Sequence, residues 1–551
     1  MADLTPDVLV VGAGINGVGT FRDLAFQGVD VLLVDKGDIS SGASAAPSRM
    51  VHGGLRYLEH GEFRLVKEAL RERDLLLHTA RHYVHPLPTF IPVRTWTTGI
   101  GTVIAQFFRL DLPRPAHRGA LMVRSGLTLY DLYTRARRQV PPHDFIPRDE
   151  ALERWPALTD DIVGVARYHD AWVSHPERLA LEVALDGMAA GGTVLTYHEV
   201  VDVADGAVVV RNELTDETIT VRPRVLINAA GPWIDQVNDA LGEGERLIGG
   251  TKGSHVVLDH PELHDLLDGE MLYHETHDGR TALMFPWHGK VIAGTTDLRI
   301  EDPDAVVTEE REIEYILETV ADVVPGLGID RSHIDATYVG VRPLPWSGPD
   351  VAPSKVSRDH SVPVSEATTE RPFPVLSLVG GKWTTFRAFA EEVTDDVLER
   401  LGRERMVATE PAEIGGAKGY PTHPDRWVAD LAAEIGLAPE RVEVLLERYG
   451  STAATVARSL GDADAPLEAH PGYSIGELRW IAEHELVVHL DDVADRRTTI
   501  AVLGETTDAL LAEIADVIAP VLGWDADRVE AEVKRARMLI DERHGLPAPA
   551  A

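Results

Sequence analysis

Cysteine is absent from this sequence of 551 residues. Its absence excludes disulfide bonds, thiolate ligation of an iron–sulfur cluster, a CxxC redox pair and a flavin bound covalently through sulfur. Long apolar runs are absent as well, because no uninterrupted apolar stretch approaches the roughly twenty residues of a membrane-spanning helix. Residues 1–6 lack the basic and apolar regions of a secretory signal peptide. We therefore expect a cytoplasmic protein, and we assign no metal site.

Basic residues are scarce relative to acidic ones. The chain has 53 Lys and Arg against 89 Asp and Glu, a formal net charge of −36. A surface this acidic repels nucleic acid and anionic lipid at low salt, so we expect no nucleic-acid partner. The charge favours a halophile, whose salt screens such repulsion, over a merely acidic protein from a GC-rich genome. The length predicts about three to four domains.

The N-terminal residues have the pattern of a βαβ unit. A short apolar run at 7–11 is typical of a strand buried on both faces of a parallel sheet. A glycine cluster follows at 12–17, residues 18–27 then show a helical pattern, and a second buried strand covers 31–34. This order is typical of a dinucleotide-binding fold.

Each glycine of the cluster has a distinct role in such a site. Gly12 makes the tight turn, Gly14 lets the backbone approach a pyrophosphate, and Gly17 lets the helix pack on the sheet. Asp35 ends the second strand and is placed to bind ribose hydroxyls, which argues against a 2′-phosphate cofactor. The pattern does not separate NAD from FAD, and the alternative is a glycine-rich turn that binds nothing.

Later segments indicate further domains. Buried strands at 224–231 and 375–379 also lead into glycines or small residues, so we expect the nucleotide domain to be discontinuous. Short β-like segments broken by turns at 251–297 indicate an inserted antiparallel platform, and the pattern after about residue 405 is helical. Residues 97–110 are apolar and almost uncharged; we favour a buried helix there over a surface that dips into a lipid interface.

Several motifs together resemble those of the FAD-dependent glycerol-3-phosphate dehydrogenases. In the order of that family they are 51–60 (VHGGLRYLEH), 62–66 (EFRLV), 229–233 (AAGPW), 252–255 (KGSH), 294–297 (GTTD), 340–344 (GVRPL) and 380–387 (GGKWTTFR). Residues 448–450, 477–478 and 490–498 resemble the C-terminal helical domain of the family. The resemblance covers almost the whole chain.

The resemblance implies the fold and its division into domains. We expect an α/β protein with a discontinuous Rossmann-like FAD-binding domain, an inserted antiparallel β substrate domain and a C-terminal all-helical domain. The predicted ranges are 1–95, 161–235 and 336–405 for the FAD-binding domain, 96–160 for a cap or substrate segment, 236–335 for the substrate domain and 406–551 for the helical domain.

The resemblance also implies the reaction, which is oxidation of sn-glycerol 3-phosphate to dihydroxyacetone phosphate by hydride transfer to FAD. The substrate is a dianion, so its pocket must offer several cations or hydrogen-bond donors. Arg56, Tyr57, Arg342 and Lys382 fall in matching motifs, and Arg342, with its planar fork, is our best candidate for holding the substrate. Loss of the hydroxyl proton calls for a base, and histidine fits best. His255 is the candidate base; a purely hydrogen-bonding role is the alternative. The predicted catalytic set is His255, Arg342 and Lys382.

Contacts to FAD follow from the same motifs. Ser44 and residues 48–50 are expected along the ribityl chain and ring edge, with His52 as a structural or flavin neighbour. Residues 381–385 would bring backbone N–H groups and a helix N-terminus to the flavin ring. The predicted cofactor-binding residues are Gly12, Gly14, Ile15, Asn16, Gly17, Asp35, Lys36, Ser44, Ser48, Arg49, Met50, Gly231, Gly381, Lys382, Trp383 and Thr384.

Three residues depart from the family pattern near the expected flavin. Pro47 removes a backbone donor, Arg49 stands where relatives usually carry Lys, and Trp383 stands where they commonly carry Leu. These departures leave the flavin prediction intact but leave open a related polyol phosphate or hydroxy acid as substrate.

The missing cysteines exclude one branch of the family that the chain resembles. Anaerobic three-subunit relatives carry a Cys-rich C-terminal domain, so this chain resembles the single-subunit aerobic type, which passes electrons to a membrane quinone. We expect peripheral contact with the inner face of the cell membrane and a homodimer. The alternatives are a glycerol-3-phosphate oxidase, an FAD-dependent amine or hydroxy-acid oxidoreductase of the same fold, and a protein in which FAD is only structural.

Overall fold

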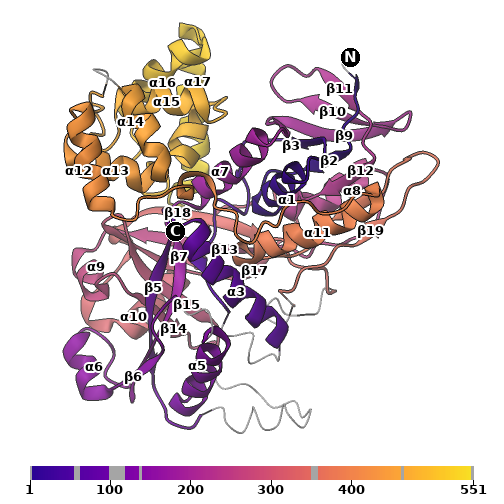
Figure 1. The fold of residues 1–551 in the computed structure, drawn as a ribbon. Helices are drawn as coiled ribbons and strands as arrows, with labels where there is room; N and C mark the ends of the chain where they lie inside the picture. The colour runs from indigo at the N-terminus through magenta and orange to yellow at the C-terminus, as the bar shows by residue number, and fades with distance from the viewer. Residues whose placement is uncertain are drawn as a thin grey trace.

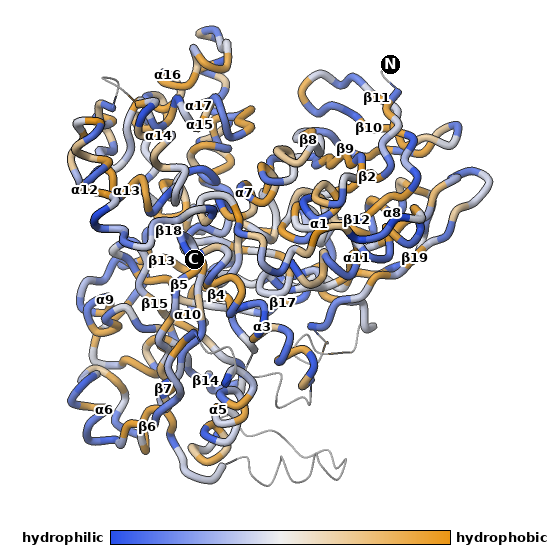
Figure 2. Tube along the Cα trace, in the orientation of Figure 1, coloured by the Kyte–Doolittle hydropathy of each residue, from blue (hydrophilic) through white to orange (hydrophobic). Residues whose placement is uncertain are grey.

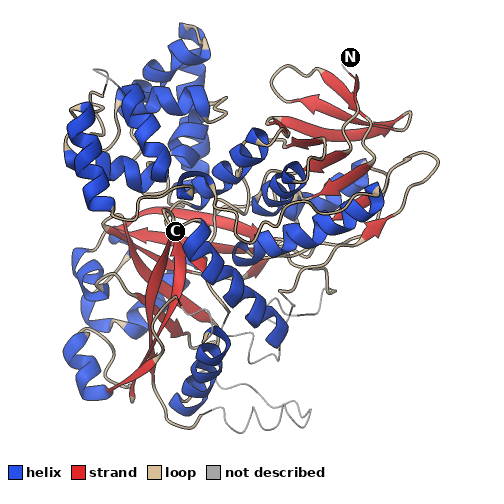
Figure 3. Ribbon diagram, in the orientation of Figure 1, coloured by secondary structure: helices blue, strands red, loops and turns tan. Residues whose placement is uncertain are grey.

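The computed structural model describes residues 3–54, 62–98, 118–135, 139–348, 351, 356, 358–460 and 464–547. A parallel sheet flanked by helices lies beside a larger, mainly antiparallel sheet, and C-terminal helices pack against both regions (Figure 1). The strands belong to the two sheet regions, whereas the C-terminal region is built of helices (Figure 3).

The parallel sheet has the strand order β19-β20-β12-β2-β3-β8, in which β19 is an antiparallel edge strand. Every residue of β2, β3 and β12 is buried, as a strand covered on both faces requires. The bounds are β2 (Val8–Val11), β3 (Val31–Val34), β8 (Thr193–Leu195), β12 (Val225–Asn228), β19 (Val364–Ser365) and β20 (Val375–Ser377).

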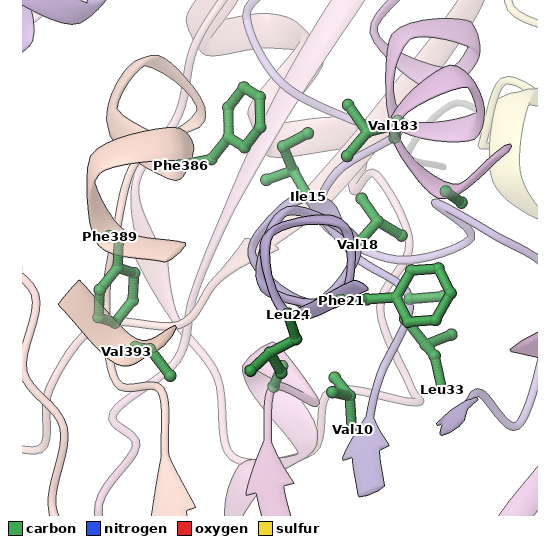
Figure 4. Packing of buried hydrophobic residues seen from close by; sticks show 14 of the residues in the cluster. Val10, Ile15, Val18, Phe21, Leu24, Leu33, Val183, Phe386, Phe389 and Val393 are labelled. Carbon is green, nitrogen blue, oxygen red and sulfur yellow. The ribbon is translucent and has the colours of Figure 1, made fainter. Parts of the chain in front are cut away.

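Helix α1 (Ile15–Phe26) packs on one face of this sheet between α7 (Pro176–Ala189) and α11 (Phe386–Leu401) (Figure 4). Glycines set the spacing of these helices. A Cβ at Gly19 would lie 2.8 Å from Cδ2 of Phe386, and one at Gly187 would lie 2.5 Å from Cε1 of Phe21. Because interiors are close-packed, these positions have no room for a larger side chain.

The opposite face of the parallel sheet is covered by a small sheet with the order β1-β11-β10-β9 and by helix α8. Leu9 and Leu226 of the parallel sheet share a core there with Val208 and Val210 of β10. The bounds are β1 (Asp3–Leu4), β9 (His198–Ala204), β10 (Ala207–Asn212), β11 (Thr218–Val221) and α8 (Ile234–Ala240).

The large sheet combines two distant stretches of chain, 50–173 and 251–342. Its order is β17-β13-β16-β15-β14-β5-β7-β4, with β18 paired to β13 and β6 paired to β7. Strand β5 falls within the range 1–95 that the sequence assigns to the FAD-binding domain, yet it pairs along its whole length with β7 of this sheet. The domain ranges themselves stay a prediction. The bounds are β4 (Met50–Val51), β5 (Val84–Val93), β6 (Asp144–Pro147), β7 (Gly164–Val173), β13 (Thr251–Leu258), β14 (Met271–Glu275), β15 (Thr281–Trp287), β16 (Lys290–Gly294), β17 (Leu298–Arg299) and β18 (Ile334–Arg342).

Helices α6, α9 and α10 cover one face of the large sheet and share its core. Phe90 and Trp155 stack there with ring centroids 4.3 Å apart. Helices α3 and α5 pack together beside β5 and β7. The bounds are α3 (Phe63–Thr79), α5 (Ala120–Thr134), α6 (Arg148–Arg154), α9 (Pro261–Leu267) and α10 (Glu310–Val323).

The C-terminal region consists of helices with one buried face. Hydrophobic and hydrophilic residues alternate along them (Figure 2), and their buried faces form two cores. The bounds are α12 (Pro424–Ile435), α13 (Pro439–Tyr449), α14 (Ala453–Leu460), α15 (Ile475–His484), the π-helical turn η9 (Asp492–Arg497), α16 (Asp508–Leu522) and α17 (Ala526–His544). Short 3₁₀ turns are η1 (Gly231–Trp233), η2 (Pro325–Leu327), η3 (Arg331–His333), η5 (Trp383–Thr385), η6 (Gly415–Ala417) and η7 (Gly450–Thr452).

The predicted fold class is confirmed. The parallel sheet receives strands from three separate parts of the chain, a mainly antiparallel sheet is inserted between them, and the region beyond α11 is helical. Within the part of the chain that the structure describes, none of the helices combines the length and the apolar character needed to cross a membrane.

Gly19 provides a test of the packing between α1 and α11. We expect Gly19→Val to lower the free energy of unfolding by about 1–3 kcal/mol, the usual cost of overpacking a core, because its side chain would press into Phe386. Thermal and denaturant unfolding of the purified protein measure this effect.

The matched control is Gly244→Ala, because a Cβ at this exposed glycine meets nothing within 4 Å. This change should alter the unfolding free energy by less than about 0.5 kcal/mol. Equal stabilities for the two variants would contradict the packing argument.

Candidate functional site

A cavity of about 1470 Å³ lies where the carboxyl ends of the parallel strands meet the large sheet. This edge is the usual ligand site of open α/β sheets. The walls come from residues between 11 and 54, from 229–237, from β13 and β18, and from 380–384. Residues of the C-terminal helices close one end.

The glycine turn after β2 forms the floor of the cavity. Gly12 has a φ of 105°, and a Cβ there would lie 2.6 Å from the carbonyl oxygen of Ala229. A Cβ at Gly17 would lie 1.9 Å from the carbonyl oxygen of Gly12, so Gly17 packs behind the turn while residues 14–16 line the cavity. Gly231, with a φ of 58°, follows at the end of β12. Glycine permits the close approaches at Gly12 and Gly17, and it is favoured at Gly231 by the positive φ.

The first turn of α1 borders the cavity, and the partial positive charge of a helix N-terminus favours an anion there. The loop 41–48 lies against this turn. The backbone N–H of Ile15 donates to Oγ of Ser44 at 2.9 Å, and Nε1 of Trp383 donates to the carbonyl oxygen of Ser44 at 3.1 Å. Ser44 therefore joins α1, its own loop and η5.

Asp35 binds the backbone of the glycine turn. Its carboxylate oxygens accept from the N–H groups of Ala13 at 2.6 Å and Gly37 at 2.8 Å. Burial raises the pKa of this carboxyl above its ordinary value. The side chain lines the cavity, and its carboxylate oxygens can accept further hydrogen bonds. Its position is therefore compatible with the predicted binding of ribose hydroxyls, which stays a prediction.

Two further glycines shape the opposite wall after β20. Gly380 and Gly381 have φ values of 77° and 90°, and Nδ2 of Asn16 donates to the carbonyl oxygen of Gly380 at 3.4 Å. The hydroxyl of Thr384 accepts from the backbone N–H of His52 at 3.1 Å. Residues 380–384 are thus tied both to α1 and to the segment after β4.

The pairing of β13 with β18 brings predicted site residues to one face. His255 lies opposite Tyr338, and Gly253 lies opposite Gly340, in the antiparallel register. Because side chains alternate along a strand, these residues share the face of Arg342, which lines the cavity with them. The rings of His255 and Tyr338 stack with centroids 4.6 Å apart.

Arg342 is held by the loop that follows β16. Its guanidinium pairs with Asp297 at 3.2 Å and donates to Oγ1 of Thr295 at 3.1 Å and to the carbonyl oxygen of Thr296 at 3.2 Å. A Cβ at Gly253 would lie 2.1 Å from Nη2 of Arg342, so only glycine leaves space for this side chain. With 24% of its side chain exposed, Arg342 is oriented and still accessible from the cavity.

The other face of β13 carries a buried cluster around Glu312 of α10. The carboxylate accepts from Oγ of Ser254 at 2.9 Å and Oγ1 of Thr296 at 2.6 Å, and pairs with Nζ of Lys252 at 2.8 Å. Thr296 belongs to the loop that holds Arg342. The cluster therefore fixes the strand and the loop from behind.

His255 is neutral at neutral pH. Burial, with Arg342 and Arg49 nearby, lowers the pKa of its imidazole to about 3. Its Nε2 lies 2.9 Å from Oγ of Ser48. Its Nδ1 is buried and has no hydrogen-bond partner among the residues that the structure describes. A neutral imidazole with one nitrogen engaged has the form needed to accept a proton.

Burial also changes the protonation of two neighbouring groups. It lowers the pKa of the Lys382 ammonium to about 7, although Glu62 and Glu68 act in the opposite direction. It lowers the pKa of His52 to about 3, with Lys382 and Arg358 contributing. At neutral pH, His52 is therefore uncharged and Lys382 is divided between its two protonation states.

Most predicted site residues gather in this cavity. Gly17 and Arg49 do not line it. The Arg49 guanidinium donates to the carbonyl oxygen of Ser174 at 3.0 Å, pairs with Glu177 at 3.1 Å and lies 4.0 Å from the ring centroid of Trp287. Arg56 and Tyr57 lie outside the described residues. Those that line the cavity are Gly12, Gly14, Ile15, Asn16, Asp35, Lys36, Ser44, Ser48, Met50, Gly231, His255, Arg342, Gly381, Lys382, Trp383 and Thr384.

Sequence reasoning missed several residues of the lining. Tyr338 precedes Gly340 by two positions, so strand alternation could have placed it on the same face. Asp297 lies in a quoted motif without an assigned role. Arg496 also lies in a quoted motif without a role in the site, and no local pattern pointed to Arg358. Both reach the cavity only through tertiary packing.

The arrangement fits a dinucleotide with an anionic substrate beside it. The glycine turn and the N-terminus of α1 are suited to bind a pyrophosphate. Arg342 and Lys382 supply a guanidinium and an ammonium for a phosphate, and His255 supplies a neutral imidazole within the same cavity.

Comparisons with known proteins agree with this geometry. Residues 7–385 match the family model described as FAD dependent oxidoreductase, and residues 407–529 match that of the C-terminal domain of alpha-glycerophosphate oxidase. A glycerol-3-phosphate dehydrogenase from Synechocystis is 33% identical over 96% of this chain and 95% of its own length. A D-erythritol 1-phosphate dehydrogenase from Brucella abortus is 35% identical over 70% of this chain and 72% of its own length.

Among solved structures, a glycerol-3-phosphate dehydrogenase from Bacillus halodurans complexed with FAD superposes with a TM-score of 0.76 at 22% identity. The match covers 99% of this chain and 97% of that one. At this identity the likeness shows a common fold.

Proposed function

This chain belongs to the FAD-dependent oxidoreductases and, among them, to the glycerol-3-phosphate dehydrogenases, and on that basis we propose that it oxidises sn-glycerol 3-phosphate to dihydroxyacetone phosphate. The membership confirms the resemblance found in the sequence motifs, and FAD is the cofactor of the family. One observation supports this substrate most directly. Arg342, Lys382 and a neutral His255 line the same cavity as the glycine turn.

We propose that the residues predicted from the sequence bind FAD, except that Arg49 acts indirectly, through neighbouring residues. The turn at 12–17 and the start of α1 hold the pyrophosphate. Asp35 binds ribose, and residues 380–384 provide the wall for the flavin ring. FAD supplies the hydride acceptor for the reaction. Arg49 supports the site through Glu177 and Trp287, beside the loop that carries Ser48.

Arg342 and Lys382 hold the phosphate group of the substrate. Asp297 and Thr295 already orient the Arg342 fork, so little side-chain entropy is lost on binding. Burial, which lowers the pKa of Lys382, also excludes water and strengthens its attraction to a dianion. Binding of the dianion in turn favours the charged ammonium.

His255 accepts the hydroxyl proton of the substrate. Its low pKa keeps it neutral before substrate binds. The nearby dianion raises that pKa, because an opposite charge favours the imidazolium. Ser48 and the stacked ring of Tyr338 hold the imidazole in place during the transfer.

We also propose a quinone as the electron acceptor, peripheral contact with the inner face of the cell membrane, and a homodimer. The membrane contact draws support from exposed apolar side chains at one edge of the molecule. Trp96, Leu121 and Leu132 are 50%, 48% and 59% exposed, and α5 carries two of them.

A second candidate substrate is a longer polyol phosphate such as D-erythritol 1-phosphate. The similarity to the D-erythritol 1-phosphate dehydrogenase from Brucella abortus favours this substrate. Pro47 and Trp383 favour it as well, since both line the cavity and depart from the family pattern. The same phosphate-binding residues would serve either substrate.

Anaerobic reduction of bound flavin tests the reaction. In buffer with high salt, sn-glycerol 3-phosphate is expected to bleach the visible band of the oxidised flavin, and a soluble quinone to restore it. Glycerol should fail at matched concentration because it lacks the dianion. Bleaching by D-erythritol 1-phosphate alone would move the assignment to the second candidate. Steady-state turnover with oxygen as fast as with the quinone would indicate an oxidase.

Replacing Arg342 tests the phosphate site. We expect Arg342→Ala to raise KM for sn-glycerol 3-phosphate by at least ~30-fold, since a charge-assisted, bidentate contact is worth roughly 2 kcal/mol. The content of bound FAD should not change. Arg342→Lys should recover part of the loss, because it restores charge without the fork.

Arg311→Ala is the matched control, because this arginine of α10 is 67% exposed and pairs with Glu309 outside the cavity. Its KM should equal that of the wild-type protein. A wild-type KM for Arg342→Ala would remove Arg342 from the site.

The pKa of Lys382, about 7, predicts a pH dependence. Its ammonium is present below that pH and lost above it, whereas a phosphate monoester is already dianionic there. KM for sn-glycerol 3-phosphate should therefore rise about tenfold between pH 7 and 9, the loss of one charge-assisted hydrogen bond. Burial is the main cause of this lowered pKa and Arg358 adds to it, whereas Glu62, Glu68 and Asp359 oppose the shift.

Lys382→Arg is the test variant, because a guanidinium stays charged over this range. Its KM is expected to stay flat from pH 7 to 9 in steady-state assays. A rise equal to that of the wild-type protein would assign the titration to another group.

A further inference from the structure

Two arginines of the C-terminal region bind a carboxylate beside the cofactor site. Nε of Arg496 donates to Oδ2 of Asp38 at 2.7 Å, and Nη1 and Nη2 of Arg497 donate to Oδ2 and Oδ1 of Asp38 at 2.6 and 2.8 Å. Both arginines lie in η9, and 458 residues separate Asp38 from Arg496. This contact exists only when the C-terminal region packs against the nucleotide-binding region.

The three side chains are fully enclosed, with exposed fractions of 0% for Asp38, 2% for Arg496 and 1% for Arg497. Burial alone would raise the pKa of the Asp38 carboxyl, but the two arginines hold it below its ordinary value. Arg496 also pairs with Asp491 at 3.0 Å and Asp492 at 2.6 Å. Removing one partner from such a buried cluster leaves charge uncompensated.

A second contact from η9 reaches the same end of the cavity. The hydroxyl of Tyr197 donates to Asp492 at 2.5 Å. The backbone N–H of Tyr197 donates to the carbonyl oxygen of Gly37 at 3.0 Å, and that of His198 donates to the carbonyl oxygen of Asp35 at 2.6 Å. The turn η9 therefore fixes both the segment 35–38 and the segment 197–198.

These two segments carry the polar groups expected around ribose. Asp35 is three residues from Asp38, and its carboxylate holds the backbone of Ala13 in the glycine turn. Arg496, Tyr197 and Asp38 all line the cavity at this end. A shift of Asp38 would thus move Asp35 and, with it, the turn that binds the pyrophosphate. Short π-helical segments occur frequently at functional sites, and η9 follows that pattern.

We propose that Arg496 and Arg497 are positioning residues for the adenosine end of the FAD site, acting through Asp38, so that docking of the C-terminal region and binding of FAD stabilise each other. This coupling is reciprocal, as any linkage between two binding equilibria must be. The inference rests on FAD as the cofactor and is independent of the substrate.

A double-mutant cycle on the holoenzyme tests the proposal. FAD affinity is measured for wild type, Asp38→Asn, Arg497→Gln and the double variant, by removing FAD and titrating it back while following flavin fluorescence. Each single change should raise the Kd for FAD at least tenfold. The double variant should be no weaker than the worse single one, because the two residues act through one contact. KM for sn-glycerol 3-phosphate at saturating FAD should stay within twofold of wild type.

Lys290→Met is the matched control. Nζ of Lys290 donates to the carbonyl oxygen of Leu503 and pairs with Asp335, both at 2.6 Å, so it also joins the C-terminal region to the rest of the chain. It contacts the large sheet and not the segment 35–38. This variant should unfold more easily while keeping the wild-type Kd for FAD.

Equal Kd values for FAD in wild type and the Asp38 and Arg497 variants, with only the unfolding temperature lowered, would overturn the proposal. Failure of the wild-type protein to bind FAD would overturn the cofactor assignment itself. If the variants do not fold, hydrogen exchange on the wild-type chain decides: adding FAD to the apoprotein should slow exchange in residues 489–498, and unchanged exchange there would refute the coupling.

Discussion

The close approach between the glycine turn and the end of β12 is the constraint on which the rest of the site depends. The backbone of Gly12 passes so near Ala229 that a Cβ would lie 2.6 Å from its carbonyl oxygen, and Gly17 closes on Gly12 in the same way. Because β12 pairs in parallel with both β2 and β20, the carboxyl ends of the three strands lie at one edge of the sheet, and the close approach of the glycine turn lets α1 start there. The loops after the three strands then meet around one cavity, and the large sheet completes its wall.

Burial sets the chemistry of this cavity more than net charge does. The chain carries −36 overall, yet the site presents Arg342 and Lys382. Desolvation lowers the pKa of Lys382 to about 7 and that of His255 to about 3, while Arg342 keeps its charge because a guanidinium titrates far above neutral pH. Desolvation thus yields a titratable cation and a neutral base, and the guanidinium beside them adds a permanent cation. Salt screens the long-range repulsion between the acidic surface and an anionic substrate, but it does not reach these enclosed contacts.

Buried charged clusters fix the elements around the cavity, and one of them joins the nucleotide-binding region to the C-terminal region. Glu312 ties β13 to the loop that holds Arg342, and Asp38 ties the segment after β3 to Arg496 and Arg497. Such clusters contribute little net stability compared with apolar packing, but they are costly to break and therefore restrict the arrangement of the elements they join. Here they connect the two ends of the cavity to parts of the chain that share no core with the parallel sheet. The C-terminal region in this way lines one end of the cavity.

The sequence by itself determined the βαβ opening, the roles of Gly12 and Gly17, the discontinuous nucleotide-binding region and a part of the cavity lining that includes His255, Arg342 and Lys382. These features follow from local patterns, since buried strands, small residues at strand ends and ordered motifs can be recognised without knowing what they contact. Only the tertiary structure decided that Arg49 turns toward Trp287, that His255 stacks on Tyr338, and that Asp38 meets Arg497. It also decided which lysine titrates near neutral pH. Strand register and burial produce these features, and both arise only when segments hundreds of residues apart pack together.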